Sequence, residues 1–504
     1  MKGDLPHDFV CSMRQLLGPE EYERFAQSME GEPEVSIRLN PHRASAAGLS
    51  LSMREGETYS QLEKMPLADA LPLQGQVPWC TTGYYLKERP LFTLHPLFHA
   101  GVYYVQEASS MFLEQVMKQY VSAGPVAMLD LCAAPGGKST HARSLLPAGS
   151  LLVSNEVMKS RAQILAENLT KWGDPDVVVT RNDPADFAAL EGTFDVLLTD
   201  VPCSGEGMFR KDEGAVNDWS RENVELCRQR QQRILADVWP ALKPGGLLIY
   251  STCTYNIYED EENVEWICRE LGAEVLPLEH HPAWGITGNL LPGASFAVAR
   301  FLPSRTKGEG LFMAALRKSG SAADEAESRS LRQRKERRGK RGGSSAVASD
   351  KALARLVNRQ QEEQLRSWLN NAGEGYLLLP QGERVLAFPT HWFPLLQELK
   401  NNLYLLQAGV ATAEVKGRDV NPCHALAMSS LLQRGAFPEV EVDREQALSY
   451  LRKEALQLPT ETPRGFVLIT YQGIPLGFVK QLGNRANNLY PQEWRIRNLC
   501  LILI

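Results

Sequence analysis

Residues 200–207 carry side chains that are suited to chemistry more than to packing. They read Asp-Val-Pro-Cys-Ser-Gly-Glu-Gly and follow an apolar run at 194–199 that predicts a buried strand. The proline stiffens the loop, and the glycines let backbone approach a substrate closely. The Asp200 carboxylate can hold a proton or a ligand, and an ionised cysteine is a nucleophile. From this stretch alone, Cys203 is either that nucleophile or a small buried cysteine in a turn.

A second thiol follows the next expected strand. Residues 247–250 form an apolar run, and Ser-Thr-Cys-Thr at 251–254 comes directly after it. Neighbouring parallel strands end at the same edge of a sheet, so Cys203 and Cys253 are expected to reach one pocket. A pyrimidine ring needs such a thiolate, because its C5 becomes nucleophilic only after addition at C6. Asp200 could then bind the base edge near N3 and N4.

The loop at 132–138 predicts a place where a ligand lies against backbone, and it matches neither a phosphate-binding loop nor the dinucleotide fingerprint. Its residues are Cys132, Ala133, Ala134, Pro135, Gly136, Gly137 and Lys138. Glu156 ends the next expected strand, roughly 20 residues on, where nucleotide sites bind ribose hydroxyls. Asp183 follows the third strand and could meet an adenine amino group. These residues suit an adenosine ligand without a triphosphate, such as S-adenosyl-L-methionine; a loop shaped only for packing is the alternative.

The middle of the chain has the pattern of elements that would position these loops. Strand-like and helix-like runs alternate between residues 126 and 271 and predict a mostly parallel sheet with helices on both faces. Ligands bind such sheets beyond the carboxyl ends of the strands, where the loops above fall. Two further apolar runs, at 296–302 and 311–316, predict an antiparallel pair.

The flanking regions have different patterns. Residues 8–29 have helical spacing, and 35–40 alternate like a half-buried strand. A strand-like run from 101 enters a helix that either has Ser109 and Ser110 as caps or begins earlier. These features predict a small α+β domain.

The C-terminal third begins after a basic run at 329–341, which predicts a solvated tether whose charge would favour RNA phosphates. Hairpins are expected around Gly382 and Gly473. Residues 484–497 interleave aromatic side chains with arginine, which suits nucleic-acid stacking and a solvated strand edge equally.

The composition limits the class of protein. A chain of 504 residues suggests about three domains. The net charge of −6 excludes a uniformly basic nucleic-acid coat, although local basic patches remain compatible with it. Nine cysteines without a C-x-x-C pair favour a reducing cytosol over a disulfide framework, and the scattered histidines, including His280 and His281, predict no metal site. Without a signal peptide or a long apolar run, we expect a cytoplasmic protein that binds no membrane.

Three central motifs together resemble those of the NOL/NOP/Sun family of RNA (cytosine-5)-methyltransferases. They are Leu-Asp-Leu-Cys-Ala-Ala-Pro-Gly-Gly-Lys-Ser at 129–139, residues 200–207, and Tyr-Ser-Thr-Cys-Thr at 250–254. Residues 37–40 and 104–111 resemble the N-terminal motifs of the family. Residues 476–480, with Tyr490-Pro491 and Trp494-Arg495, resemble the PUA-like tail of the bacterial small-subunit rRNA methyltransferase F subgroup.

The resemblance implies an S-adenosyl-L-methionine-dependent enzyme that forms 5-methylcytosine in 16S rRNA, acting on rRNA or the small ribosomal subunit as a monomer. Cys253 would attack C6, and Cys203 would assist elimination and product release. The implied cofactor-binding residues are 132–138, Glu156, Asp183 and Asp200. Val201 stands where alanine is more usual, which adds bulk but removes no functional group.

The expected fold class is α/β, with a doubly wound, mostly parallel seven-stranded methyltransferase domain, a small α+β N-terminal domain and a C-terminal PUA-like β-rich domain. The expected divisions are 1–90 for the N-terminal RNA-binding domain, 91–317 for the catalytic domain, 318–354 for the basic linker, 355–400 for a small α+β segment and 401–504 for the PUA-like RNA-binding domain.

Other functions remain open on the sequence. A tRNA cytosine-5 methyltransferase would share these motifs. A DNA cytosine-5 methyltransferase would use the Pro-Cys thiol and a Glu-Asn-Val motif; residues 262–264 match that triplet, but it follows acids from Glu259 on that predict a solvated helix start. A non-catalytic RNA-binding assembly factor would not need the cofactor loop that is present here.

Overall fold

The computed structural model describes residues 5–46, 71–320 and 356–497. The basic run at 329–341, on which the expected linker depends, lies outside these residues. No helix in the described ranges is both long and apolar enough to cross a membrane.

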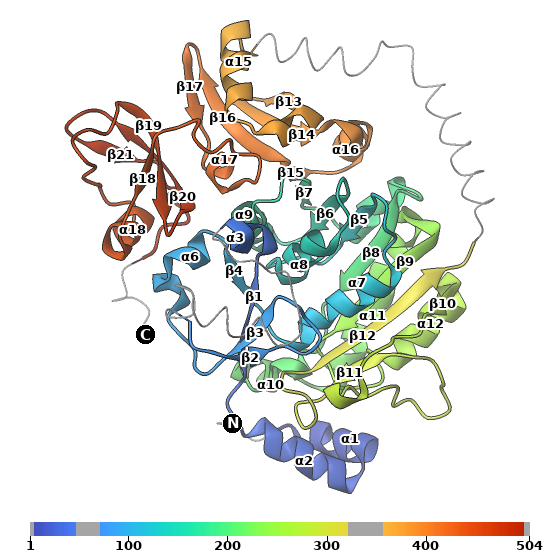
Figure 1. Cartoon of the computed structure of the whole chain (residues 1–504). Coiled ribbons are helices and arrows are strands. Elements are labelled where there is room, and N and C mark those ends of the chain that lie inside the picture. The colour runs from blue at the N-terminus through green and yellow to red at the C-terminus, as the bar shows by residue number, and fades with distance from the viewer. Residues whose placement is uncertain (1–4, 47–70, 321–355, 498–504) are drawn as a thin grey trace, which may run out of the picture.

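A nine-stranded sheet forms the centre of the molecule (Figure 1). Its strands are β5 Ala127–Asp130, β6 Leu151–Asn155, β7 Val177–Thr180, β8 Phe194–Asp200, β9 Leu242–Thr252, β10 Ala273–Val275, β11 Ala299–Phe301, β12 Leu311–Lys318 and β15 Leu405–Ala408. The order is β10-β12-β9-β8-β5-β6-β7-β15, with β11 paired to β12. Strands β5 to β9 are parallel, and β12 and β15 run antiparallel to their neighbours. The expected doubly wound sheet and the antiparallel pair β11–β12 are therefore confirmed, and β10 and β15 extend the expected seven strands.

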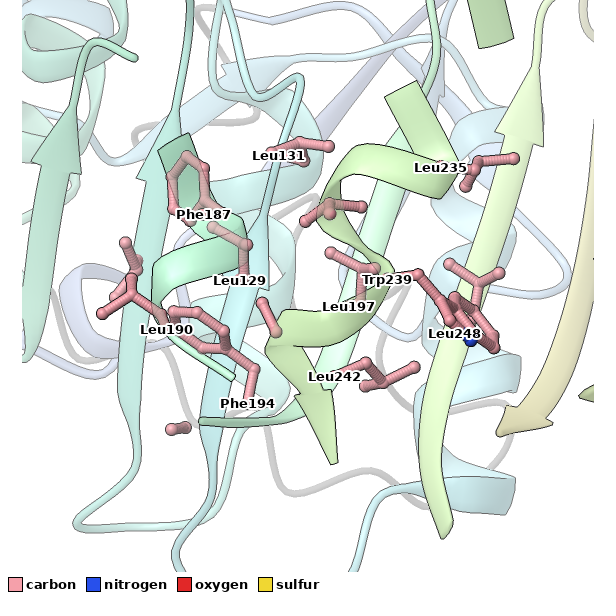
Figure 2. Close-up of a cluster of buried hydrophobic side chains, with 14 of the residues drawn as sticks. Leu129, Leu131, Phe187, Leu190, Phe194, Leu197, Leu235, Trp239, Leu242 and Leu248 are labelled. Atoms are coloured by element: carbon pink, nitrogen blue, oxygen red, sulfur yellow. The ribbon is translucent and has the colours of Figure 1, made fainter. Parts of the chain in front are cut away.

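Both faces of this sheet are buried, which is why its strands are continuous apolar runs. Leu129, Leu197 and Leu248 pair in register on one face, beneath Leu235 and Trp239 (Figure 2). The opposite face is covered by apolar side chains of helices that precede and follow β5. The core thus fixes the strand ends that carry the loops.

The helices include the expected alternation with strands β5 to β9 and others that the sequence did not predict. They are α1 His7–Leu17, α2 Pro19–Met29, α3 Pro41–Ala46, α6 Pro96–His99, α7 Leu113–Tyr120, α8 Gly137–Leu145, α9 Lys159–Trp172, α10 Glu213–Asp218, α11 Arg221–Val238, α12 Glu261–Leu271, α15 Arg359–Ser367, α16 Phe393–Asn402, α17 His424–Met428 and α18 Arg444–Leu451. The run at 8–29 is two helices, because Gly18 adopts a positive φ of 77° that breaks the helix.

The serine caps expected before α7 are wrong. Ser109 and Ser110 lie inside a short 3₁₀ helix, Ser109–Phe112. The Glu107 carboxylate accepts hydrogen bonds from both backbone N–H groups at 2.9 Å and therefore supplies the cap.

The N-terminal sheet has the order β2-β3-β1-β4. Its strands are β1 Val35–Leu39, β2 Leu73–Gln76, β3 Gly83–Leu86 and β4 Tyr103–Val105. Because β4 pairs with β1, this sheet crosses the expected division at residue 90.

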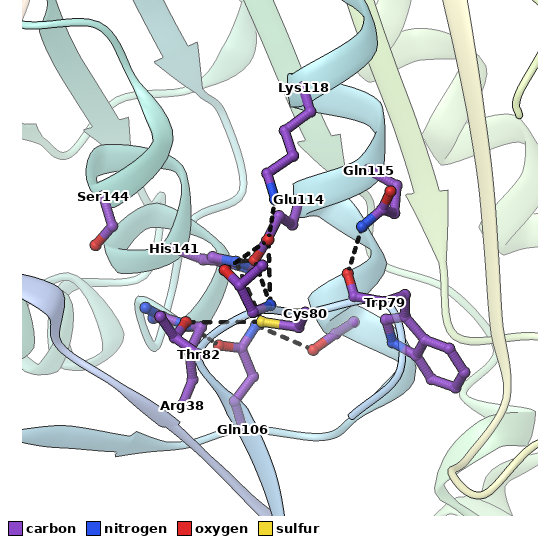
Figure 3. A network of polar contacts seen from close by, with 12 residues as sticks. Arg38, Trp79, Cys80, Thr82, Gln106, Glu114, Gln115, Lys118, His141 and Ser144 are labelled. Carbon is purple, nitrogen blue, oxygen red and sulfur yellow. Dashed lines mark hydrogen bonds and ion pairs between the residues drawn. The ribbon is translucent and has the colours of Figure 1, made fainter. Parts of the chain in front are cut away.

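Arg38 and Asn40 of the N-terminal motif connect this sheet to the catalytic part, and Figure 3 shows Arg38 beside Gln106. The buried Arg38 guanidinium donates to Gln106 Oε1 at 2.7 Å and to Thr140 Oγ1 of α8 at 2.6 Å. Asn40 Nδ2 donates to the carbonyl oxygens of Gly101 and Trp172. The motif therefore holds the N-terminal sheet against the catalytic part through hydrogen bonds.

Two smaller sheets form the C-terminal third. Their strands are β13 Tyr376–Gln381, β14 Arg384–Pro389, β16 Val410–Lys416, β17 Asp419–Pro422, β18 Glu439–Glu441, β19 Gly465–Tyr471, β20 Ile474–Gln481 and β21 Ala486–Asn488. Both expected hairpins form, as β13–β14 and β19–β20. The first sheet crosses the expected division at residue 400. Tyr490 is 1% exposed in a hydrophobic core, so for this residue both expected roles, nucleic-acid stacking and a solvated strand edge, are wrong.

Candidate active site

The two predicted thiols meet beyond the ends of neighbouring strands. Asp200 at the end of β8 pairs in register with Ser251 of β9, so the loops that follow begin side by side. The Sγ atoms of Cys203 and Cys253 lie 3.1 Å apart. The hydrogen bond between the thiols and burial raise the pKa of Cys203 well above its usual value. Cys203 therefore keeps its proton and can donate toward the Cys253 sulfur.

Asp200 is held between a cation and a hydroxyl. Lys138 Nζ lies 2.8 Å from Asp200 Oδ2, and Ser251 Oγ donates to Asp200 Oδ1 at 2.8 Å. Burial alone would lower the pKa of Lys138, but the attraction of Asp200 outweighs it and the pKa is raised. The ammonium, which also interacts with Cys253, stays charged next to the thiols.

A cavity of about 180 Å³ adjoins this ion pair. The expected loop supplies much of its wall, namely Cys132, Ala133, Ala134, Pro135, Gly137 and Lys138, together with Asp130 and Asp200. Residues 104–107 and Ser110 supply the rest. The sequence motif at 104–111 did not by itself indicate that these residues line a site.

One carboxylate oxygen in the cavity wall has no hydrogen-bond partner among residues 5–46, 71–320 and 356–497. Asp130 is fully buried, and Ser139 Oγ donates to its Oδ2 at 2.6 Å, while no described residue donates to its Oδ1. Burial raises the pKa of Asp130 to about 7. An orphaned acceptor beside glycine-rich backbone fits a ligand that brings N–H donors or positive charge, and S-adenosyl-L-methionine brings both.

Glu156 and Asp183 do not line this cavity and lie after β6 and β7. Glu156 accepts from the N–H of Met158 at 2.9 Å and lies 3.4 Å from Arg161, which in turn donates to the carbonyl oxygen of Ala134. The exposed Asp183 accepts from the N–H of Ala185 in a capping box. Their expected contacts with a cofactor remain proposals.

Two buried glutamates bind the thiol loops to each other. Glu206, in the Cys203 loop, accepts from the backbone N–H groups of Tyr255 at 2.7 Å and Asn256 at 3.1 Å. Glu259, beyond the Cys253 loop, accepts from the N–H of Ser204 at 3.0 Å and from its Oγ at 2.5 Å. Each loop thus carries the acid that holds the other. Burial and the nearby Glu206 raise the pKa of Glu259 to about 7.

The interpretation of the acidic run as a solvated helix start is wrong. Glu259, Asp260 and Glu261 are fully buried. Arg300 balances the last two, since its guanidinium lies 2.9 Å from Asp260 and 2.5 Å from Glu261, while Ser204 and Gln231 donate to Glu259. Asn263 of the Glu-Asn-Val triplet is also buried. Its amide donates to Gln231 Oε1 and to the hydroxyl of Tyr250.

Among the described residues, one group of side chains could bind a metal ion: Cys80 between β2 and β3, Glu114 of α7 and His141 of α8 (Figure 3). The Glu114 carboxylate already binds the ammonium of Lys118 at 2.6 Å and the hydroxyl of Thr81 at 2.8 Å. Its charge is therefore balanced by a lysine, and we assign no metal to it.

Three family models match the chain. The model described as 16S rRNA methyltransferase RsmB/F matches residues 123–317, the N-terminal domain of 16S rRNA methyltransferase RsmF matches 5–108, and the methyltransferase RsmF PUA domain matches 437–496.

Curated relatives match over nearly their whole length. The ribosomal RNA small subunit methyltransferase F of Klebsiella pneumoniae (strain 342) is 30% identical over 503 residues, which cover 97% of this chain and 96% of that protein. The protein of the same description from Vibrio cholerae serotype O1 (strain M66-2) is 28% identical over 501 residues, covering 97% of each chain.

Among solved structures, NSun6 from Pyrococcus horikoshii with SFG superposes with a TM-score of 0.50 at 19% identity, covering 63% of this chain and 99% of that one. This likeness shows the fold. The family models and the relatives confirm three predictions: the α/β methyltransferase fold, the dependence on S-adenosyl-L-methionine and the PUA domain. The chain therefore belongs to the 16S rRNA methyltransferase F family.

Proposed function

We propose that the protein transfers the methyl group of S-adenosyl-L-methionine to C5 of a cytosine in 16S rRNA, through a covalent bond between Cys253 Sγ and C6. The observation that carries this proposal is the thiol pair, 3.1 Å apart at the ends of β8 and β9, beside the Lys138–Asp200 ion pair. The relatives named for the small-subunit rRNA support the choice of substrate.

The proposed reaction begins when the Cys253 thiolate adds to C6 of the flipped-out base. Asp200, held in place by Ser251, binds the base edge near N3 and N4, which helps the ring accept the charge. C5 becomes nucleophilic and takes the methyl group that the cofactor supplies. Water takes the C5 proton, and its electron pair expels Cys253 from C6 as a thiolate. Cys203, which keeps its own proton, assists by donating a hydrogen bond to the departing sulfur 3.1 Å away.

The cofactor would lie along residues 132–138, with the orphaned oxygen of Asp130 as an acceptor. Glu156 and Asp183 would meet its adenosine part. We further propose that the protein acts as a cytoplasmic monomer whose N-terminal and PUA parts hold the RNA. The sheet pairings favour domain divisions later than residues 90 and 400.

The test compares the wild type with Cys253→Ala and Cys203→Ala on 16S rRNA or small subunits with a labelled methyl donor. We expect Cys203→Ala to accumulate a denaturation-resistant protein–RNA adduct, and Cys253→Ala to form neither adduct nor 5-methylcytosine. Cys268→Ala, which removes a thiol from α12, is the matched control. Retained 5-methylcytosine formation by Cys253→Ala would overturn the assignment.

Transfer RNA remains the alternative substrate, and a competition between tRNA and 16S rRNA distinguishes the two. Duplex DNA is disfavoured, because Asn263 is buried in hydrogen bonds and offers no donor to a base. An adduct formed by Cys253→Ala would favour the DNA-type mechanism, in which Cys203 attacks.

A further inference from the structure

A cavity of about 620 Å³ lies where three parts of the chain that are remote in sequence meet. Helix α9 and strand β15 of the catalytic sheet form one wall. The sheet that contains β14 and β16 forms the second, and the sheet that contains β19 and β20 forms the third. Figure 1 shows the three parts side by side. The volume of this cavity is within the range of ligand-binding clefts, roughly 300–1,000 Å³.

Two cations in the wall of this cavity lack acidic partners among the described residues. Arg384 is exposed, and Lys480 places its Nζ 5.1 Å from the centre of the Phe466 ring. Glu414, which faces Arg384 across the paired strands, also lines the cavity, and its nearest lysine, Lys416 at 3.3 Å, is shared with Glu383 at 3.8 Å. With two cations against one carboxylate, the wall of the cavity keeps an excess of positive charge, which suits a phosphate.

The same cavity has an aromatic wall with free hydrogen-bonding atoms. Trp494 and His424 pack edge to face, 5.1 Å apart, and both line the cavity. Neither ring nitrogen of His424 has a hydrogen-bond partner in the part of the chain that the structure describes, although both are buried. Burial lowers the pKa of His424 to about 3, so the ring is neutral and offers one donor and one acceptor. Aromatic surface with these atoms suits a nucleobase.

We propose that this cavity binds one nucleotide of single-stranded RNA outside the catalytic pocket, with its phosphate at Arg384 and Lys480 and its base against Trp494 and His424. The proposal rests on the proposed function, because it assumes an RNA substrate. It also gives a place to the aromatic and basic pattern at 484–497: Tyr490 belongs to the core, whereas Trp494 faces the cavity. Because all three parts contribute, the site would anchor RNA only on the assembled molecule.

The test measures the affinity of the full-length protein for a fluorescein-labelled 16S rRNA fragment over a range of salt concentrations. The variant is Arg384→Gln/Lys480→Gln. The control, Arg359→Gln/Arg366→Gln, removes the same charge from exposed positions on α15. Because the variant removes both cations that would bind phosphate, we expect affinity to fall about tenfold and the slope of log K against log salt to decrease by about two, with no such change in the control. Equal losses of affinity in the two double variants would overturn the proposal.

A second measurement locates the RNA directly. RNA that carries 4-thiouridine should crosslink to the peptide containing Trp494, and Arg384→Gln/Lys480→Gln should reduce that crosslink. A crosslink map without this peptide would overturn the site. Both readouts are independent of methylation. If the wild type makes no 5-methylcytosine but the cavity variant still loses RNA affinity selectively, the proposed function fails and the cavity assignment stands.

Discussion

Glu206→Gln should disable the active site without touching the cofactor cavity. Four donors converge on the buried carboxylate: the N–H groups of Tyr255 and Asn256 on one oxygen, and Trp219 Nε1 and Asn256 Nδ2 on the other. Glutamine replaces one carboxylate oxygen with an NH₂ group, which donates and does not accept. Each oxygen accepts two hydrogen bonds, so two of the four are lost whichever way the amide is oriented.

The size of the expected loss of activity follows from the free energy of these hydrogen bonds. A hydrogen bond to a buried charged group contributes about 1.5–3 kcal/mol, so losing two costs about 3–6 kcal/mol before the relief of burying a charge is subtracted. Part of that energy holds the backbone that follows Cys253. A displacement of about 1 Å there costs about 100-fold in rate, or about 2.7 kcal/mol of transition-state stabilisation.

Single-turnover methyl transfer to 16S rRNA measures the loss, and calorimetry measures cofactor affinity. We expect a rate about 100-fold lower than that of the wild type, with cofactor affinity unchanged because Glu206 does not line the cavity. Glu213→Gln, an exposed glutamate on α10, is the matched control. A wild-type rate in Glu206→Gln would refute the idea that this carboxylate positions the thiol loop.

Three further predictions concern neighbouring groups. Arg38→Lys should weaken S-adenosyl-L-methionine binding about tenfold by calorimetry, because the variant loses the hydrogen bonds to Gln106 at the cavity and to Thr140 of α8. The control is Arg89→Lys at an exposed position, and equal affinities in the two variants would contradict the view that Arg38 supports the cofactor cavity. Asp200→Asn should lower the methyl-transfer rate by at least about 100-fold, and a rate near that of the wild type would remove Asp200 from the mechanism. The pKa of Glu259 rises from 4.5 to about 7 on folding, so the native protein holds a proton that the unfolded chain releases between these values. The free energy of unfolding should therefore fall as pH rises through this window, by at most about 3 kcal/mol from this group. Glu259→Gln should flatten that dependence in denaturant titrations, and an unchanged slope would contradict the burial argument.

The sequence predicted most of the catalytic sheet because each strand is buried on both faces and therefore reads as an apolar run. It also predicted that Cys203 and Cys253 meet, since neighbouring parallel strands end at one edge. The acidic run at 259–261 was misread because its partner, Arg300, lies on a distant strand, and acids at a helix start are usually solvated. The burial of Tyr490 depends in the same way on contacts with residues far along the chain.

Strand β15 shows a further limit of local patterns. It begins at Leu405, in the C-terminal third, yet it pairs with β7 of the catalytic sheet, more than two hundred positions earlier in the chain. Nothing within the short run at 405–408 indicates which sheet it joins, because strand pairing is decided by the whole fold.

The placement of β15 has a consequence for how the protein is made. Strands β6 and β7 leave the ribosome early, but the outer edge of β7 stays uncovered until residue 408 has been synthesised. An apolar edge of this kind is a template for aggregation, and β15 closes it as a cover supplied by the other end of the chain. A truncated form that ends before β15 would therefore leave the edge of β7 unpaired and should aggregate more readily than the full chain.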